Sequence, residues 1–513
     1  MKVFLMHRDQ DIDLERKLPP NHEALTQDLE LDTLMGAIAD GDPFLFDVVK
    51  NVILTSVTDP DAIVYRQRVL ADCLEQTSIV RQMYDIAVGA IKSERKVYGS
   101  LFRDSPDSIL SRSVQVLELL VDSLKQLRQL ADDHASKFDS EAFARFFAML
   151  AVELDDEYLA AIDEHLKELK LRRGVLMSAE IGKGNKGTRH VLHRSPEQSW
   201  LERIADSITD GGRPGYSFQI ADRDENGFRA LARLRGQGVN LVANALAQST
   251  DHVLSFFTML RMELAFYVGC LNLHERLVEK GEPTCFPDPM PVGRPVLSAR
   301  GLYDVCLTLN LEARVMGNDV SAEDKALVMI TGANQGGKST FLRSVGLAQL
   351  MMQGGMFVPA ASFRANVSGG IFTHYKREED ASMKSGKLDE ELGRMSDIAD
   401  EITPNCILLC NESFAATNER EGSEIARQVV RALIEAGIKI FFVTHLFDLA
   451  HGFYRQRLDT AFFLRAERQP DGGRTFRLVE GEPLPTSYGE DSYRRIFGAA
   501  SGAAPAAPSD IRR

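Results

Sequence analysis

The feature that most constrains this chain is a glycine-rich loop between an apolar run and a helix-forming segment. Residues 331–340, TGANQGGKST, fit G-x-x-x-x-G-K-[ST] from Gly332 to Ser339 and directly follow the apolar run KALVMIT. Such glycines let backbone N–H groups surround a phosphate, while the lysine reaches the outer phosphates and the serine hydroxyl binds Mg²⁺. The loop therefore predicts a strand–loop–helix unit that binds a nucleotide. Its expected ligands are Gly332, Gly336, Gly337, Lys338 and Ser339.

Two further apolar runs end in polar residues that suit nucleotide chemistry. The run CILLC ends at Asn411 and Glu412, and the run IKIFFV ends at Thr444 and His445. Because ligands gather at the carboxyl edge of open parallel sheets, we expect Glu412 to act as general base and His445 to contact the γ-phosphate. The alternatives, a surface acid and a structural histidine, stay open. Asn411 stands where an aspartate usually organises Mg²⁺, so Ser339 and Asn411 are the expected Mg²⁺ ligands and slow turnover is expected.

The part of the chain that precedes this unit is predicted to be helical. Asp107 to Arg173 contains no glycine or proline, and an apolar stripe recurs there at spacings of three and four residues. Long helices are expected over 141–173 and over 241–280, as an antiparallel pair of levers. The stripe consists of Val116, Leu120, Leu124, Leu127 and Leu130.

Between the predicted levers, residues 174–194 form two strand-like runs around a Gly/Asn/Lys turn, which predicts a hairpin at the tip. The whole chain has 60 Lys and Arg against 74 Asp and Glu, a net charge of −14, which excludes a globally basic nucleic-acid coat. From Ile181 to Arg194, however, there is no acid. This leaves two interpretations, a solvated hairpin or a patch that contacts phosphates. The candidate DNA-binding residues are Lys183, Lys186, Arg189, His190 and Arg194.

Composition and chain ends indicate the class of protein. With 513 residues, 44% of them hydrophobic, the chain has room for about three globular domains. The start, MKVFLMHRDQDIDLER, has no apolar core of a secretory signal, and Val345 to Phe363 contains Gln, Gly-Gly and Pro. We therefore expect a cytoplasmic protein that does not span a membrane. The predicted segments are an N-terminal segment (1–24), a helical core with the first lever (25–173), a tip or clamp-like insertion (174–240), the second lever (241–280), a P-loop ATPase domain (281–498) and a flexible tail (499–513).

These residues together resemble the MutS family of DNA mismatch-repair-type ATPases. The family's nucleotide loop has the pattern T-G-x-N-x-G-G-K-S-T, which 331–340 fits throughout, so Asn334 and Thr340 join the expected ATP ligands. Residues 355–360 (GMFVPA), 371–374 (IFTH) and 487–489 (SYG) are similar to its G-x-x-V-P-A, I-F-T-R and S-Y-G segments. The resemblance implies a helical core with long lever helices and a small β-containing tip, followed by an ABC-like P-loop ATPase domain that pairs with a second copy.

The chain also departs from the family pattern. The family segment D-E-x-G-R-G-T-S-T-x-x-G is NESFAATNEREG at 411–422, so Asn411 replaces the aspartate and Asn418 replaces the signature serine that acts in the partner's site. The N-terminal segment carries no Phe-x-Glu wedge. We therefore expect a short member without mismatch-recognition and connector domains. The leading function is a dimeric, ATP- and Mg²⁺-dependent DNA clamp; the alternative is a nucleotide-gated protein-interaction switch that binds no DNA.

Overall fold

The computed structural model describes residues 1–97, 105–172, 174–194, 219–221, 223–377, 386–469 and 473–484. The chain forms two compact units, each assembled from segments that are distant in sequence. One comprises Met1–Leu5 and Gln76–Leu264, and the other comprises Met6–Glu75 and Ala265–Arg513. This division differs from the predicted succession of segments, because residues 6–75, grouped above largely with the helical core, pack with the unit that contains the glycine-rich loop. The predicted tail at 499–513 lies outside the described residues.

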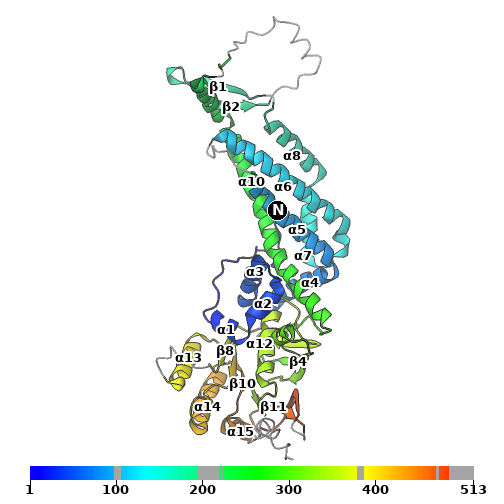
Figure 1. Cartoon of the computed structure of the whole chain (residues 1–513), viewed down its shortest axis with the longest axis vertical. Coiled ribbons are helices and arrows are strands. Elements are labelled where there is room, and N and C mark those ends of the chain that lie inside the picture. Colours follow the sequence, from blue (N-terminus) through cyan, green and yellow to red (C-terminus); the bar gives the residue numbers. More distant parts are fainter. Residues whose placement is uncertain are drawn as a thin grey trace, which may run out of the picture. The chain divides into compact units, whose positions relative to one another are not determined.

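The first unit is mainly helical, as expected. Helix α6 starts where Ser105 accepts a hydrogen bond from the Ser108 backbone N–H and Pro106 occupies the first turn. The predicted apolar stripe of α6 is buried, which confirms that it faces the core. Figure 1 shows α6 lying alongside α5. The helices of this unit are α5 (Thr77–Lys96), α6 (Pro106–His134), the short η1 (Ala135–Lys137), α7 (Glu141–Glu153), α8 (Asp156–Leu169) and part of α10 (Glu225–Glu279).

The two predicted levers differ in outcome. The prediction of a single helix over 141–173 was wrong, because the chain leaves helical geometry at Leu154. A new helix, α8, begins after Asp155, whose side chain caps it by accepting the Tyr158 N–H at 2.7 Å. The second lever, α10, is longer than expected and starts at Glu225 rather than near residue 241. Among the described residues α10 is the one helix long and apolar enough to cross a membrane, but most of that stretch is buried against protein, as in a core helix.

The predicted hairpin is confirmed. Strands β1 (Leu176–Ile181) and β2 (Gly187–His193) pair antiparallel, and the turn between them contains a short helical segment, η2 (Lys183–Asn185). Gly184 in this turn has a φ of 74°, a conformation that glycine adopts without steric cost. Residues 195–218 of the predicted tip lie outside the described residues.

The second unit is built on a six-stranded sheet with the order β12-β11-β6-β10-β9-β8. All neighbouring pairs are parallel except β11 with β12. The mixed helical and α/β fold expected from the sequence is therefore present. The strands are β6 (Leu327–Thr331), β8 (Ile371–Tyr375), β9 (Ile407–Asn411), β10 (Lys439–Val443), β11 (Ala461–Arg468) and β12 (Arg474–Glu480).

Helices cover both faces of this sheet. Leu408 of β9 belongs to a buried cluster with Val430, which lies in α14, whereas Leu409 faces Gly346, which lies in α12. Because successive side chains of a strand point to opposite faces, α12 and α14 cover opposite faces, as Figure 1 also shows. The helices of this unit, besides the rest of α10, are α1 (His22–Asp28), α2 (Leu31–Ala39), α3 (Pro43–Leu54), α4 (Pro60–Glu75), α11 (Val305–Asn310), α12 (Lys338–Gly354), α13 (Lys387–Glu401), α14 (Glu419–Glu435) and α15 (Phe447–Gln456).

A smaller four-stranded sheet completes the second unit, with the order β3-β7-β4-β5. Its central pair, β7 with β4, is antiparallel. Pro359 links this sheet to the segment after α12, because its backbone oxygen accepts the Tyr303 N–H at 3.0 Å. The strands are β3 (Asp288–Met290), β4 (Leu297–Leu302), β5 (Asn318–Ser321) and β7 (Ser362–Asn366).

Candidate nucleotide site

The glycine-rich loop connects β6 to α12, and its glycines are required by close backbone packing. Gly332 has a φ of 111°, and a Cβ there would lie 2.8 Å from the backbone nitrogen of Ala466. A Cβ on Gly336 would lie 2.6 Å from the Ala466 side chain, and Gly337 has a φ of 87°. Any larger residue at these positions would displace the loop from β11 or strain its backbone. The result is a tight turn that leads into the N-terminus of a long helix. Backbone N–H groups at such a position are suited to bind a phosphate.

Lys338 is folded back into this loop. Its Nζ donates hydrogen bonds to the backbone oxygens of Gly332 and Ala333, at 3.0 and 2.9 Å, and the residue is only 5% exposed. Burial lowers the pKa of Lys338 to about 8, against the opposing effect of the Glu412 carboxylate. The amine therefore sits at the centre of the loop, next to the groups that a bound polyphosphate would face.

Ser339 and Asn411 meet at the carboxyl edge of the sheet. The Ser339 hydroxyl, in the first turn of α12, donates a hydrogen bond to the Asn411 amide oxygen at the end of β9, at 2.8 Å. Both groups offer oxygen atoms, the ligand type that hard cations such as Mg²⁺ prefer, although neither oxygen carries a charge. The two predicted Mg²⁺ ligands thus lie together, and their chemistry fits that ion.

Glu412 and His445 follow neighbouring parallel strands, β9 and β10, and form a pair. His445 Nε2 lies 2.9 Å from Glu412 Oε1, and both side chains are about one-third exposed, at 27% and 32%. The hydrogen bond from His445 is the largest cause that lowers the pKa of Glu412, so this carboxylate stays ionised near neutral pH. An ionised carboxylate with partial solvent access is suited to accept a proton from water.

A cavity of about 370 Å³ opens beside His445. It is lined by Thr331 and Gly332 of the loop region, by His445 after β10, and by Glu419 in the first turn of α14. The structure therefore brings Lys338, Ser339, Asn411, Glu412 and His445 to one edge of one sheet, and one of them, His445, lines this cavity. Strand ends that are far apart in sequence meet here because they belong to parallel neighbours.

Three further predicted site residues differ in their surroundings. Asn334 is exposed on the loop, and Thr340 is partly buried in the first turn of α12. Asn418 caps α14, because its side chain accepts the Glu421 backbone N–H at 3.0 Å and donates to the Glu421 carboxylate at 3.1 Å. The cap gives Asn418 a structural role in this chain, and its expected role in a partner's site stays a prediction.

The hairpin carries less free positive charge than its sequence indicated. Arg194 pairs with Glu164 and Glu168 of α8, at 2.6 and 2.5 Å, and these carboxylates raise its pKa. Arg189 pairs with Glu180 across the hairpin at 3.2 Å. The acids missing from 181–194 are thus supplied by segments outside that stretch.

The remaining candidates of the hairpin differ in exposure. Lys183 and Lys186 are exposed at the turn, and neither has a carboxylate within ion-pair distance in the described part of the chain. His190 is partly buried, and its Nε2 is enclosed without a hydrogen-bond partner among the described residues. Free positive charge is therefore concentrated on the two lysines of the turn.

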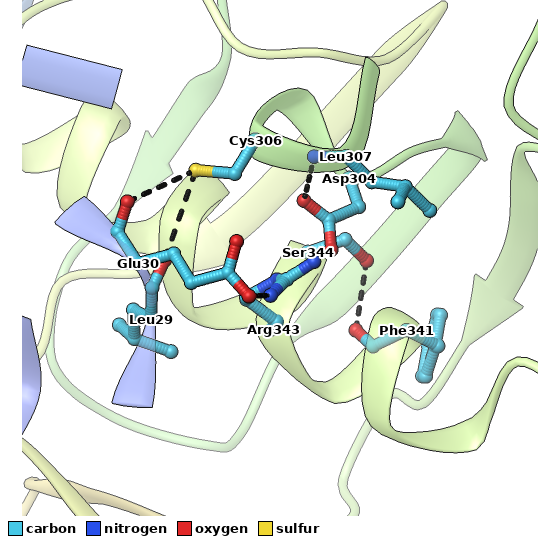
Figure 2. Close-up of polar contacts among 8 residues, drawn as sticks. All are labelled: Leu29, Glu30, Asp304, Cys306, Leu307, Phe341, Arg343 and Ser344. Atoms are coloured by element: carbon cyan, nitrogen blue, oxygen red, sulfur yellow. Dashed lines mark hydrogen bonds and ion pairs between the residues drawn. The ribbon is translucent and has the colours of Figure 1, made fainter. Parts of the chain in front are cut away.

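Sequence reasoning missed the residues that fix α12 behind the loop. Arg343, one turn after Ser339, forms ion pairs with Asp304 at 2.6 Å and with Glu30 (Figure 2). The Asp304 carboxylate is fully buried and also accepts the Leu307 backbone N–H at 3.0 Å. Breaking such a buried pair on one side costs about 3–5 kcal/mol, so Arg343 anchors the helix that carries Lys338 and Ser339. No sequence motif connects positions 30, 304 and 343.

Comparisons with known proteins identify relatives of two parts of the chain. Residues 58–280 match the family described as MutS2 N-terminal domain, and residues 328–493 match MutS domain V. MutS protein homolog 4 of Mus musculus is 27% identical over 247 residues, which is 46% of this chain and 24% of that protein.

Bacterial relatives match different lengths of the chain. The DNA mismatch repair protein MutS of Prochlorococcus marinus is 24% identical over 375 residues, 72% of this chain and 38% of that protein. MutS of Thermotoga sp. is 36% identical over 133 residues, 26% of this chain and 17% of that protein. The chain thus corresponds to well under half the length of these relatives. Since two models of one family match successive parts that together make up most of the chain, it belongs to the MutS family.

Proposed function

We propose that this chain binds and hydrolyses ATP with Mg²⁺, and that the nucleotide cycle gates the binding of DNA in repair or recombination. The observation that carries the ATPase part is the convergence of three groups at one sheet edge. These are the buried Lys338, the Ser339–Asn411 pair and the Glu412–His445 pair. Charge, metal ligands and a base within one site are what phosphoryl transfer to water requires.

Each group would have a separate task. Lys338 and the loop N–H groups would hold the phosphates, and Ser339 and Asn411 would hold Mg²⁺, which neutralises charge on the phosphate oxygens. Glu412 would orient the attacking water and accept its proton, while His445 would hold the Glu412 carboxylate in place. Asn411 provides an oxygen without a charge, so it would bind Mg²⁺ less firmly than aspartate and turnover would be slow.

The DNA part of the proposal draws support from two sources. The bacterial relatives above are named DNA mismatch repair proteins, and the hairpin presents two exposed lysines in a chain of net charge −14. We propose DNA contacts through Lys183 and Lys186, in a cytoplasmic homodimer paired through its ATPase domains. Backbone phosphates would be recognised rather than a mismatched base, because lysine side chains bind phosphate oxygens, which carry no sequence information.

One experiment tests both parts. ATP turnover is measured with and without duplex, single-stranded and junction DNA, next to DNA binding at several salt concentrations. We expect slow Mg²⁺-dependent turnover that a branched DNA changes more than a linear duplex does. Absence of ATP turnover would refute the ATPase part. Turnover without binding to any DNA at low salt would refute the DNA part and favour the protein-interaction switch.

A further inference from the structure

The turn that carries Glu412 has an unusual backbone. Glu412 has a φ of 56° and Phe414 a φ of 62°, in the left-handed region that non-glycine residues rarely adopt. The MutS pattern D-E-x-G places glycine, for which this conformation costs nothing, where this chain has Phe414. Strain of this kind persists only where the surrounding structure holds it. Contacts with neighbouring residues must therefore hold this turn in place.

The restraint comes from His374, at the neighbouring strand β8. Its Nδ1 lies 2.7 Å from the Ser413 hydroxyl oxygen, and that hydroxyl also lies 2.7 Å from the His374 backbone oxygen. Burial lowers the pKa of His374 to about 4, so the ring is neutral and its Nε2–H donates to the Glu391 backbone oxygen at 3.0 Å. The single Ser413 proton is then shared between two acceptors on one residue, which ties the turn to β8.

The Phe414 side chain is held by the same histidine. The two rings are stacked with centroids 5.5 Å apart, and neither residue is exposed to solvent. The backbone oxygen of Phe414 also lies so close to Gly422 of α14 that a Cβ there would be 2.4 Å away. Ser413 and Phe414 thus lie in a closed pocket between β8, α13 and α14, directly after Glu412.

We infer that His374 and Ser413 are positioning residues, which hold Glu412 at the angle from which it meets water and His445. This inference rests on the proposed ATPase function. Two departures from the family pattern support it, because they touch one another: His374 stands in place of the arginine of I-F-T-R, and Phe414 stands in place of the glycine of D-E-x-G. His374 also contacts Ser413, the residue between Glu412 and Phe414. A glycine turn needs no such support, whereas a phenylalanine turn at positive φ does.

The sharpest variant is Ser413→Ala, which removes only the hydroxyl that joins the turn to His374. Ser423→Ala is its matched control, because Ser423 is equally buried, lies in the adjacent α14 and has a hydroxyl without a hydrogen-bond partner among the described residues. Both are measured in the full-length protein for kcat, for ATP affinity and for melting temperature. They are also made in a Glu412→Gln background.

We expect Ser413→Ala to lower kcat by about ten- to a hundredfold, since a small misplacement of a catalytic group has an effect of that size. ATP affinity should change less than twofold, because the phosphates would be bound by the glycine-rich loop, which follows β6, and not by the turn that follows β9. Ser423→Ala should keep the wild-type kcat. In the Glu412→Gln background, Ser413→Ala should leave the residual rate unchanged, because it acts through Glu412.

Three results would overturn the inference. The first is a wild-type kcat in Ser413→Ala. The second is an equal loss in both backgrounds, which indicates a general effect on the fold, whatever the melting temperature. Either result leaves the ATPase proposal intact. The third is a wild-type chain without ATP turnover, which removes the ATPase proposal and this inference with it.

Discussion

The Ser339 hydroxyl donates to the Asn411 amide oxygen across 2.8 Å, which joins the first turn of α12 to the end of β9. Strand β10 lies between β6 and β9 in the sheet, so this bond reaches over a strand. It brings the loop that would bind phosphate to the turn that carries Glu412. The predicted metal ligands therefore connect the proposed phosphate-binding loop with the turn of the proposed general base.

Replacing Lys338 with alanine should lower ATP affinity by about a hundredfold, because a charged hydrogen-bond donor is lost from the centre of the loop. The melting temperature should change little. Burial of the lysine's charge costs free energy, and its hydrogen bonds go only to loop carbonyls. Titration calorimetry measures the affinity. The control is Lys325→Ala, at a partly buried lysine before β6 whose Nζ donates to the backbone oxygen of Asp459. Unchanged affinity in folded Lys338→Ala would exclude this loop as the ATP site.

ATP binding should be linked to proton uptake by Lys338. The pKa of this lysine is lowered to about 8 by burial, and an adjacent polyphosphate would raise it again. At pH 8 about half a proton should be taken up per ATP bound, and affinity should fall as pH rises above 8. Calorimetry in buffers of different ionisation enthalpy measures the uptake. Equal uptake by Lys338→Ala would assign the proton to another group.

Changing Asn411 to aspartate should lower the Mg²⁺ concentration for half-maximal ATP turnover by about tenfold, because a carboxylate binds the ion more firmly than an amide. Turnover at saturating Mg²⁺ should rise or stay equal. Mg²⁺ titrations of the steady-state rate measure both. An Asn411→Asp protein with the wild-type Mg²⁺ requirement would show that Asn411 does not face the metal.

Glu412→Gln should reduce kcat by about 10²–10⁴-fold and leave ATP affinity near the wild-type value, because the carboxylate acts only in the chemical step. Single-turnover hydrolysis and equilibrium binding separate the two effects. Glutamine has the shape of glutamate and keeps the contact with His445, which limits changes to the turn. Hydrolysis at the wild-type rate would place the base elsewhere.

DNA binding through the hairpin should show a log-affinity against log-salt slope near −2 per subunit, since two lysines of the turn are free to neutralise phosphates. Counting all four cations of 181–194 gives a slope nearer −4, but Arg189 and Arg194 already pair with carboxylates. The double variant Lys183→Ala/Lys186→Ala should flatten the slope and leave DNA-independent ATP turnover unchanged.

The control for this prediction changes two exposed lysines of α5 instead, as Lys92→Ala/Lys96→Ala. It should keep the wild-type slope. DNA affinity should differ little between matched and mismatched duplexes and more between linear and branched DNA. Contacts with the phosphate backbone recognise the shape of the DNA rather than the identity of its bases. A wild-type slope in the hairpin double variant would refute the hairpin as the contact.

Local sequence determined the parts of this protein that depend on short-range physics. The glycine-rich loop predicted a strand, a tight turn and a helix, because only glycine fits at Gly332 and Gly337. The apolar stripe of α6 predicted its buried face, since a period of three and four places those residues on one side. The endings of β9 and β10 predicted that Glu412 and His445 lie at the same edge of the sheet as the loop, because parallel strands share one carboxyl edge.

Tertiary structure alone decided the rest, where residues distant in sequence meet. The free charge of the hairpin depends on Glu164 and Glu168, which reach Arg194 only after α8 has folded beside it. The anchor of α12 needs Asp304 beside Arg343, and the turn after Glu412 needs His374 beside Ser413. Pairings of this kind follow no local period, because packing and long-range hydrogen bonds set them. Motif and period therefore located the candidate nucleotide site, and long-range packing determined how its residues are held.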